Sequence, residues 1–172
     1  ERTSEVVQQK ELIERKQKEI VDSINYAKRI QGALLASDQL FDTNLKNYFL
    51  FFQPKDIVSG GVYWGAGMAN GNVVLVTADS TGHGVPGAMM SMLKISCLNE
   101  AVSERKVTDP AEILKHARQR IISSLSQDGS LEGGKDGMDC SVIVFDFKKK
   151  KMLYAGANNP VWVARKNNEG VT

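Results

Sequence analysis

The sequence predicts an α+β fold, in which helices and strands occupy separate stretches of the chain. Three observations support this class: a helical stretch comes first, strand-like segments stand on both sides of a pair of helices, and the two element types do not alternate singly. Single alternation would instead indicate a doubly wound βαβ fold. The order favours an α+β sandwich, and 172 residues give room for one domain with a full core.

The first stretch, residues 1–36, is expected to be helical because it has no glycine or proline before Gly32 and is rich in Glu, Lys, Gln and Arg. One set of residues recurs every seven positions: Val6, Ile13, Ile20, Ala27 and Leu34. The companion positions are polar until the last of them: Gln9, Lys16, Ser23 and Ile30. The spacing is typical of a coiled coil. A charged helix lying on its own domain is the other interpretation, and the sequence leaves both open.

Three antiparallel strands are expected next, at residues 47–53, 62–69 and 72–78. These segments are short, rich in β-branched and aromatic residues, and separated by turn signals that include Asn70-Gly71.

Two helices should follow. The segment 85–104 carries apolar residues on several faces, so we expect a largely buried helix whose methionines belong to the core. The second helix has a clear start, with Asp109 as cap, Pro110 in the first turn and Glu112 three residues after the cap. Its inward-facing residues are expected to be Ile113, Leu114, Ala117, Ile121 and Leu125.

The last third of the chain is expected to hold a flexible glycine-rich loop at 126–137 and then strands at 138–147, 152–157 and 161–165. The basic run Lys148 to Lys151 is interpreted as a solvated hairpin turn.

Composition excludes several classes of function. A net charge of +2 is too small to indicate a nucleic acid or an anionic membrane as partner. No apolar stretch is long enough to span a bilayer, and the charged start is not a signal peptide. The two cysteines, Cys97 and Cys140, provide neither a disulfide framework nor a C-x-x-C metal site. We expect a cytoplasmic protein with no direct membrane contact from this chain.

The residues that could carry chemistry lie at strand ends. Asp79 ends one apolar strand and Asp139 begins another, while Gly82, Gly84 and Gly87 allow a close approach of the backbone. Oxygen ligands without cysteine or clustered histidine favour Mg²⁺ or Mn²⁺ over zinc. The alternative is that each aspartate caps the loop that follows it through backbone N–H groups, and spacing alone does not decide between them.

The loop between these glycines lacks the G-x-x-x-x-G-K-[ST] pattern of a phosphate-binding loop. His83 has the chemistry to relay a proton, although a lone loop histidine is more often a hydrogen-bonding residue. No Ser-His-Asp or Cys-His arrangement can be assembled from the spacing.

Four segments together resemble the sporulation stage II protein E branch of the metal-dependent protein phosphatases, which are relatives of protein phosphatase 2C. They are "PKDIVSGGVYW" (54–64), "ADSTGHGVPGAMMS" (78–91), "GMDCSVIVFD" (137–146) and "YAGANNPVW" (154–162). Residues 24–40 also resemble the helical linker that precedes this domain in bacterial signalling proteins. The resemblance divides the chain into a helical linker at 1–36 and a phosphatase-like domain at 37–172 that lacks the family's C-terminal part.

The resemblance implies a β-sandwich flanked by helices, with two Mn²⁺ or Mg²⁺ ions between the sheets and a bridging water that attacks phosphoserine or phosphothreonine. Asp79 and Asp139 match catalytic metal-binding carboxylates, and the carbonyl of Ser80 matches a main-chain ligand. His83 lies where family members differ, so no role is carried over to it. The implied partner is a phosphorylated regulatory protein, such as an anti-sigma-factor antagonist, and the N-terminal helix is a candidate homodimer contact.

The chain departs from the family pattern in two places. The family's "SGDFYW" is "SGGVYW" here, so Gly61 stands where an aspartate ligand belongs. The chain also ends at "EGVT", before the late aspartate-glycine motif of the family. Asp56 is not expected to substitute, because odd separations along a strand face opposite sides. A catalytically degenerate phosphatase fold that serves as an interaction module therefore stays open beside an active enzyme.

Overall fold

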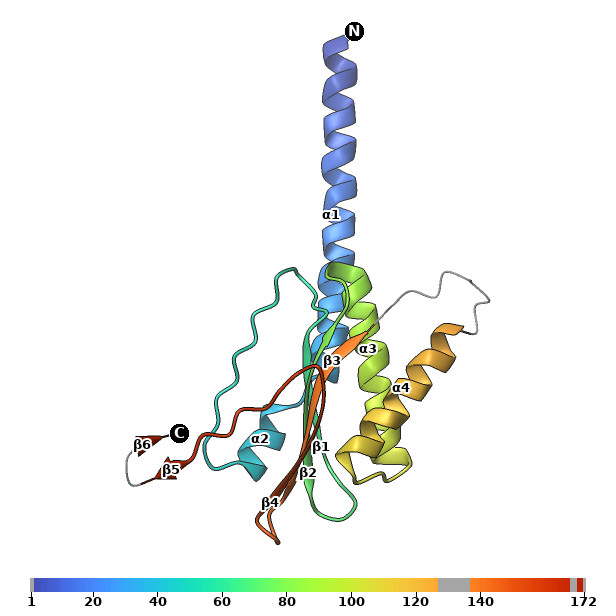
Figure 1. Ribbon diagram of the computed structural model, residues 1–172. Coiled ribbons are helices and arrows are strands. Elements are labelled where there is room, and N and C mark those ends of the chain that lie inside the picture. The colour runs from blue at the N-terminus through green and yellow to red at the C-terminus, as the bar shows by residue number, and fades with distance from the viewer. Residues whose placement is uncertain (1, 127–136, 168–169, 172) are drawn as a thin grey trace.

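The computed structural model describes residues 2–126, 137–167 and 170–171, and it confirms the α+β class. Figure 1 shows its elements. The helices are α1 (Arg2–Leu34), α2 (Asp38–Asn44), α3 (Gly84–Asn99), a π-helical turn η1 (Glu100–Glu104) and α4 (Pro110–Ser126). The strands are β1 (Val62–Gly67), β2 (Val73–Ser80), β3 (Met138–Asp146), β4 (Lys151–Ala157), β5 (Lys166–Asn167) and β6 (Gly170–Val171).

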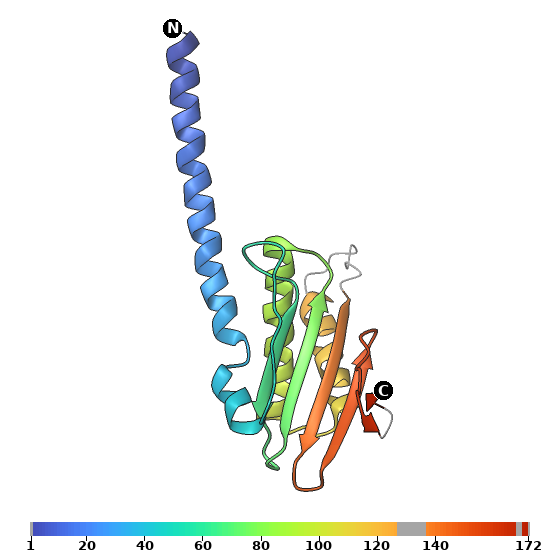
Figure 2. The same ribbon diagram turned by 90° about the vertical axis from the view of Figure 1, so that its left-hand side faces the viewer.

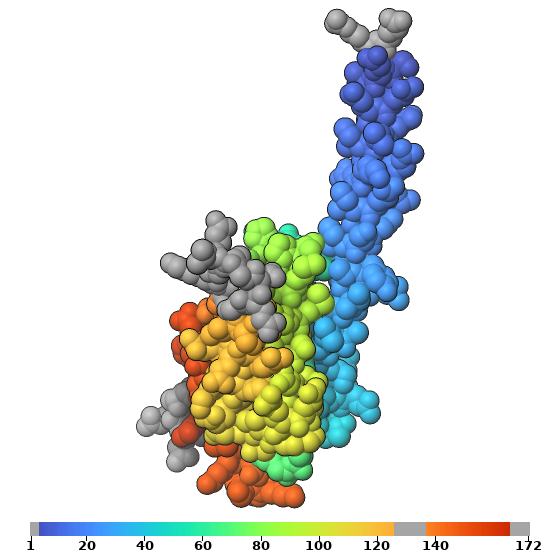
Figure 3. Space-filling model, turned by 90° about the vertical axis from the view of Figure 1, so that its right-hand side faces the viewer, coloured from blue at the N-terminus to red at the C-terminus, as the bar shows by residue number. Residues whose placement is uncertain are grey.

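The first four strands form one antiparallel sheet in the order β1-β2-β3-β4. Helices α3 and α4 lie side by side on one face of this sheet, behind the strands in Figure 2 and in front of them in Figure 3. Side chains alternate between the two faces of a strand, and the helix-facing set is fully buried or nearly so: Val74, Val76, Ala78, Cys140, Val142 and Val144. They pack with Leu98, Ile113 and Ala117 from the helices to form the core.

The other face of the sheet is more open. Its side chains come from the alternate positions of the same strands: Leu75, Thr77, Ile143, Phe145, Met152 and Tyr154. The segment between α2 and β1, and the segment after β4, lie on this side of the sheet, away from α3 and α4 (Figure 1). Of the expected sandwich, the described residues contain this one four-stranded sheet with its helical layer, and the only other strand pairing among them is the short β5–β6 hairpin.

Helix α1 projects from the domain and touches it only through its C-terminal part, where it contacts α3 (Figures 1 and 3). The expected long helix is therefore confirmed, and its first half does not lie on its own domain. Its seam residues Ile13 and Ile20 are mostly exposed. No described helix, α1 included, combines the length and apolarity needed to cross a bilayer.

Two expected strands are absent from the structure. Residues 47–53 are irregular, and Phe49 is 91% exposed. Pro54 lacks the N–H that would continue a ladder, and aromatic content alone does not supply a partner strand. Residues 161–165 are also irregular, with Trp162 92% exposed. Here β4 ends where Asn158 takes a left-handed φ of 52° and Pro160 follows two residues later.

Features that depend on local sequence signals were predicted more accurately than these strands. Oδ1 of Asp109 accepts hydrogen bonds from the backbone N–H groups of Ala111 and Glu112 at 2.9 and 3.0 Å, which confirms the helix start. Lys148 to Lys150 lie in the turn between β3 and β4, with Lys150 at a φ of 51°, and Lys151 begins β4. The expected helix at 85–104 ends in the π-helical turn η1 rather than in α-helix. Most of the expected loop at 126–137 lies outside the described residues.

Candidate metal centre

Asp79 and Asp139 stand directly opposite each other in the sheet, as cross-strand partners of β2 and β3. Because Ala78 and Cys140 face the helices, the two aspartates face the other, open side. Both are exposed. Directly opposite residues in an antiparallel pair have Cβ atoms about 4.5–5.5 Å apart. The fold thus brings together two carboxylates that are 60 positions apart in the chain.

Two carboxylates in this position repel each other unless a positive charge lies between or beside them. Asp139 has one neutral partner, because Nδ2 of Asn158 donates to its Oδ2 at 3.1 Å. Asp79 has no hydrogen-bond or ion-pair partner in the described part of the chain. Neither aspartate accepts a hydrogen bond from a backbone N–H group of the described residues. The alternative that each aspartate caps the following loop is therefore not supported. This contact of Asn158, which lies in the segment 154–162, was not among the sequence predictions.

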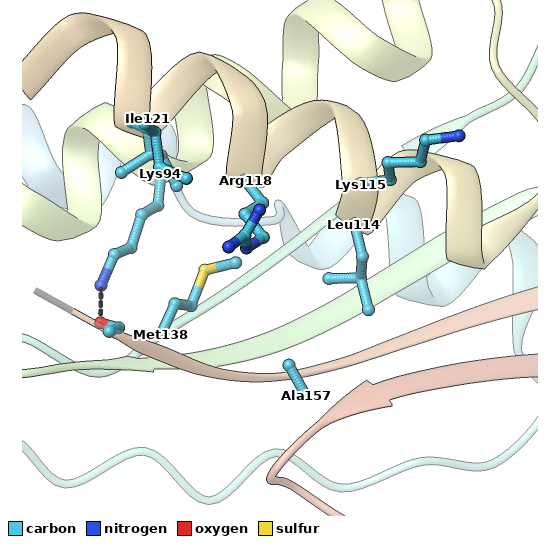
Figure 4. Close-up of a pocket in the computed structure, with 9 residues that line it drawn as sticks. Lys94, Leu114, Lys115, Arg118, Ile121, Met138 and Ala157 are labelled. Carbon is cyan, nitrogen blue, oxygen red and sulfur yellow. Dashed lines mark hydrogen bonds between the residues drawn. The ribbon is translucent and has the colours of Figure 1, made fainter. Parts of the chain in front are cut away.

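Ser80, the expected main-chain ligand, is the last residue of β2. Its N–H donates to the carbonyl of Gly60 at 3.2 Å. Its hydroxyl accepts from Nζ of Lys94 at 2.9 Å, and the same ammonium donates to the carbonyl of Gly137 at 2.7 Å. Lys94 reaches this position from α3, and Figure 4 shows its ammonium hydrogen-bonded near the start of β3. The end of β2 and the start of β3 are thus held together from the helix side, one residue after Asp79 and two residues before Asp139.

Lys94 is fully buried, and the sequence analysis missed it because lysine is normally solvated. Its position between Leu93 and Ile95 in an apolar helix was the available signal. Burial of an ammonium requires hydrogen-bond acceptors around it, and Ser80 and Gly137 provide two of them.

Gly61 lies beside the carboxylate of Asp79. A Cβ placed on Gly61 would be 3.4 Å from Oδ1 of Asp79 and 3.6 Å from Oγ of Ser59, which is ordinary or slightly tight contact. A side chain at this position would therefore meet Asp79 without a backbone clash. This is the position at which the family pattern has an aspartate.

Backbone segments around the site approach each other closely. A Cβ on Gly60 would lie 2.7 Å from the carbonyl oxygen of Gly82, and a Cβ on Gly87 would lie 2.6 Å from the same oxygen. Gly82 itself has a φ of +89°, a backbone conformation that residues other than glycine rarely adopt. The close backbone approach expected at Gly82 and Gly87 is confirmed, and with Gly60 it joins the loop after β2 to the start of α3 and to the residue before Gly61.

A cavity of about 390 Å³ opens beside Asp79. Its lining includes Lys55, Asp56, Gly61, His83 and Gly84. Residues 54–61 are bent rather than extended in a strand, so the strand-spacing argument against Asp56 does not apply. The carboxylate of Asp56 is instead engaged by His83, whose Nδ1 lies 3.0 Å from Oδ2.

Helix α1 is tied to the same region through Gln31, a buried side chain. Nε2 of Gln31 donates to the carbonyl of Ser59 at 2.6 Å and to Oγ of Ser91 at 2.8 Å, and Oε1 accepts from the N–H of Ser59 at 3.0 Å. Ser59 is two residues before Gly61, and Ser91 belongs to α3. Helix α1 therefore holds the segment that forms one wall of the cavity.

The donor set suits one hard divalent cation. Mg²⁺ commonly binds through one or two carboxylates and keeps several waters, and Asp79 with Asp139 provides that number. In the parts of the chain that the structure describes, no group of three or more His, Cys, Asp or Glu side chains could hold a metal ion. Burial raises the pKa of the Cys140 thiol, next to Asp139, to about 12, so no thiolate is available. The described residues thus do not supply the larger set of ligands that the two ions implied by the family resemblance would need.

Another cavity, of about 430 Å³, lies between α4 and the start of β3 (Figure 4). Its walls are mainly apolar and come from Leu114, Ile121 and Met138, with Lys115 and Arg118 on α4. None of the expected site residues lines it, because it is on the helix side of the sheet.

Comparison with known proteins shows the family and the fold of the chain. Residues 69–172 match the family model described as stage II sporulation protein E (SpoIIE). Among solved structures, the chain is similar to the SiaA-PP2C domain of Pseudomonas aeruginosa, with 33% sequence identity and a TM-score of 0.69. That match covers 82% of this chain and 55% of the solved chain, so the chain spans about half the length of the domain it resembles. None of the curated proteins matches the chain.

Proposed function

Because the chain belongs to the stage II sporulation protein E family, we propose that it acts as a metal-dependent protein phosphatase domain that hydrolyses phosphoserine and phosphothreonine. The fold class and the family support a phosphatase-fold domain. The observation that carries the proposal is the cross-strand pair of Asp79 and Asp139, of which Asp79 lines an open cavity.

In this function the two carboxylates and the carbonyl of Ser80 would hold Mn²⁺ or Mg²⁺, whose charge would activate a water and offset the charge of the phosphoryl group. The chain itself contributes placement. Asp79 and Asp139 are fixed by the β2–β3 register, and Lys94 holds the strand ends together on the opposite side of the sheet. Lys55, on the cavity wall, supplies a positive charge to a phosphorylated substrate.

The substrate class is a phosphorylated regulatory protein in the bacterial cytoplasm, and an anti-sigma-factor antagonist is the closest analogy within this kind of signalling system. We expect no role for nucleic acid. Helix α1 is proposed to bring two copies together, because its heptad positions are exposed and polar residues surround them. The contact of Gln31 with Ser59 and Ser91 gives that helix a physical connection to the cavity wall.

The test is phosphate release from phosphoserine and phosphothreonine peptides by the complete protein with Mn²⁺. We expect turnover that is lost on addition of a chelator and in Asp79→Asn and Asp139→Asn. An absence of phosphate release from every peptide would contradict the enzyme function.

One observation favours a second candidate function. With Gly61 in place of a carboxylate, the described residues offer only two acidic side chains to a metal, which fits a degenerate phosphatase fold that binds a partner without turnover. This function predicts that Gly61→Asp raises phosphatase activity sharply, while partner binding survives Asp79→Asn. Efficient turnover by the unmodified protein would rule it out.

A further inference from the structure

We propose that Asn158 is a positioning residue of the metal centre, whose side-chain amide holds one oxygen of Asp139 and leaves the other oxygen for a cation. The inference rests on the proposed phosphatase function and adds to it a residue that acts through Asp139 rather than on the substrate. It is drawn from the segment after β4, which lies on the open side of the sheet that Asp79 and Asp139 also face (Figure 1).

The contact between the two side chains is a hydrogen bond to a carboxylate. Nδ2 of Asn158 donates to Oδ2 of Asp139 at 3.1 Å. The amide nitrogen must be the atom that faces Asp139, because an amide oxygen has no hydrogen to donate and would meet another acceptor. Hydrogen bonds of this kind are stronger than those between two neutral groups. The other carboxylate oxygen, Oδ1, has no bonding partner in the described part of the chain.

The backbone of Asn158 brings its amide to this position. Asn158 has a left-handed φ of 52°, a conformation that asparagine adopts more readily than most residues. It also forms an isolated parallel bridge with Cys140, the residue that follows Asp139. Asparagine therefore meets two requirements at position 158, because it tolerates the turn and carries the donor that reaches Asp139.

The turn itself is held down on the sheet by the carbonyl of Asn159. This oxygen accepts hydrogen bonds from Oγ of Ser141 and from the hydroxyl of Tyr154, both at 2.7 Å. Ser141 is buried and lies two residues after Asp139, on the same face of β3. Its cross-strand partner is Gly156, where a Cβ would collide with the Tyr154 hydroxyl and lie 2.9 Å from the Asn159 oxygen. The turn is thus fixed to the strand that carries Asp139.

This support makes the two carboxylates of the pair unequal. Asp139 is held by Asn158 before any cation arrives, whereas Asp79 has no hydrogen-bond or ion-pair partner among the described residues. Hydrogen-bond partners that orient a metal-binding side chain typically change the affinity for the metal by about 10- to 100-fold. The amide of Asn158 is the group in this chain that has such a role toward Asp139.

The first test is calorimetric titration of the complete protein with Mn²⁺. Asn158→Gly removes the amide without straining the turn, because glycine accepts a positive φ, and it should lower the affinity for Mn²⁺ by about tenfold or more. Asn70→Gly is the matched control. Asn70 is an exposed residue of the turn between β1 and β2, at the end of β2 opposite to Asp79, and its side chain bonds only to the N–H of Asn72 among the described residues. It should bind Mn²⁺ as tightly as the wild type.

Nitrogen NMR of the side-chain amides separates a positioning role from direct contact with the cation. Without any metal, the amide signals of Asn158 should already differ between the wild type and Asp139→Asn, because the carboxylate that accepts from Nδ2 is lost. On titration with Mg²⁺, the Asn158 signals should shift in the wild type and not in Asp139→Asn. The signals of Asn70 should stay unchanged throughout.

Each failure has its own signature. If the wild type binds Mn²⁺ and Asn158→Gly binds it equally well, the positioning role is wrong while the metal centre stands. The role is also wrong if Asn70→Gly loses as much affinity, or if the metal-free Asn158 signals are the same with and without the Asp139 carboxylate. If the wild type binds neither Mn²⁺ nor Mg²⁺, the proposed function itself fails, and the role of Asn158 fails with it.

Discussion

At the scale of single residues, position 61 controls how many carboxylates meet at the end of β2. A Cβ at Gly61 would be 3.4 Å from Oδ1 of Asp79, so Gly61→Asp should add a third acidic group beside the pair. Two unit charges about 4 Å apart interact by roughly 1 to 4 kcal/mol near a protein surface. We therefore expect Gly61→Asp to tighten Mn²⁺ binding about tenfold or more in a calorimetric titration.

Gly61→Asn is the matched control for this prediction, because it adds a similar volume and an oxygen but no charge. It should gain less affinity than Gly61→Asp. Equal affinities for Mn²⁺ in the glycine and aspartate forms would show that position 61 does not face the cation.

The close backbone contact at Gly87 gives a second prediction. Gly87→Ala would place its Cβ 2.6 Å from the carbonyl oxygen of Gly82, which forces the loop after β2 away from α3. We expect a loss of about 1–3 kcal/mol in the free energy of unfolding, the usual cost of overpacking. Denaturant unfolding measures it directly.

Gly32→Ala is the control, since Gly32 is also helical and a Cβ there would have nothing within 4 Å. It should stabilise the protein by about 0.5–1 kcal/mol, because alanine favours helix over glycine. A Gly87→Ala protein as stable as this control would contradict the described packing of the loop.

Several residues of the site were predictable one by one. Asp79 and Asp139 were predicted from their positions at strand ends and from the family resemblance. Their direct opposition depends on the β2–β3 register, which joins segments separated by two helices. The pair Asp56 and His83, and the buried Lys94, depend on tertiary contacts between segments far apart in the chain, and no local pattern specifies such contacts.

At the scale of elements, helix α1 carries a heptad pattern of apolar residues that its own domain does not bury. Its heptad residues Ile13 and Ile20 are mostly exposed in the structure. Replacing both with serine should abolish a dimer held by this seam, because each helix would lose apolar surface at the centre of the contact. Light scattering across a dilution series should then give a monomer mass at concentrations where the wild type is a dimer.

The control variant changes Glu11 and Lys18 to serine, since these exposed residues belong to the same helix but lie outside the seam. Its mass should match that of the wild type. A mass that stays the same in the Ile13 and Ile20 variant would contradict dimerisation through α1.

Helices were predicted better than strands because their signals are local. The absence of glycine and proline before Gly32 and the Asp109 cap correctly predicted α1 and α4, whereas the short helix α2 was not predicted. Residues 47–53 and 161–165 have strand-like composition, yet neither has a partner strand among the described residues. A strand requires a neighbour to accept its hydrogen bonds, and composition carries no information about that neighbour.

At the scale of the whole molecule, the sheet has one face filled by helices and one face that carries the site. The helix-facing residues Val74, Val142 and Val144 are fully buried, so the core holds β2 and β3 in register. This register sets Asp79 opposite Asp139. The α+β class followed from the order of elements in the sequence, whereas the division between a covered and an open face required the sheet topology.

The proposed function depends on Asp79 and Asp139 together holding one divalent cation. The measurement that tests it most directly is calorimetric titration of the complete protein with Mn²⁺, alongside Asp79→Asn and Asp139→Asn. We expect the wild type to bind, and each variant to lose about tenfold or more in affinity, since each removes a charge from the pair. Binding that is unchanged in both variants, or absent from the wild type, would contradict the claim.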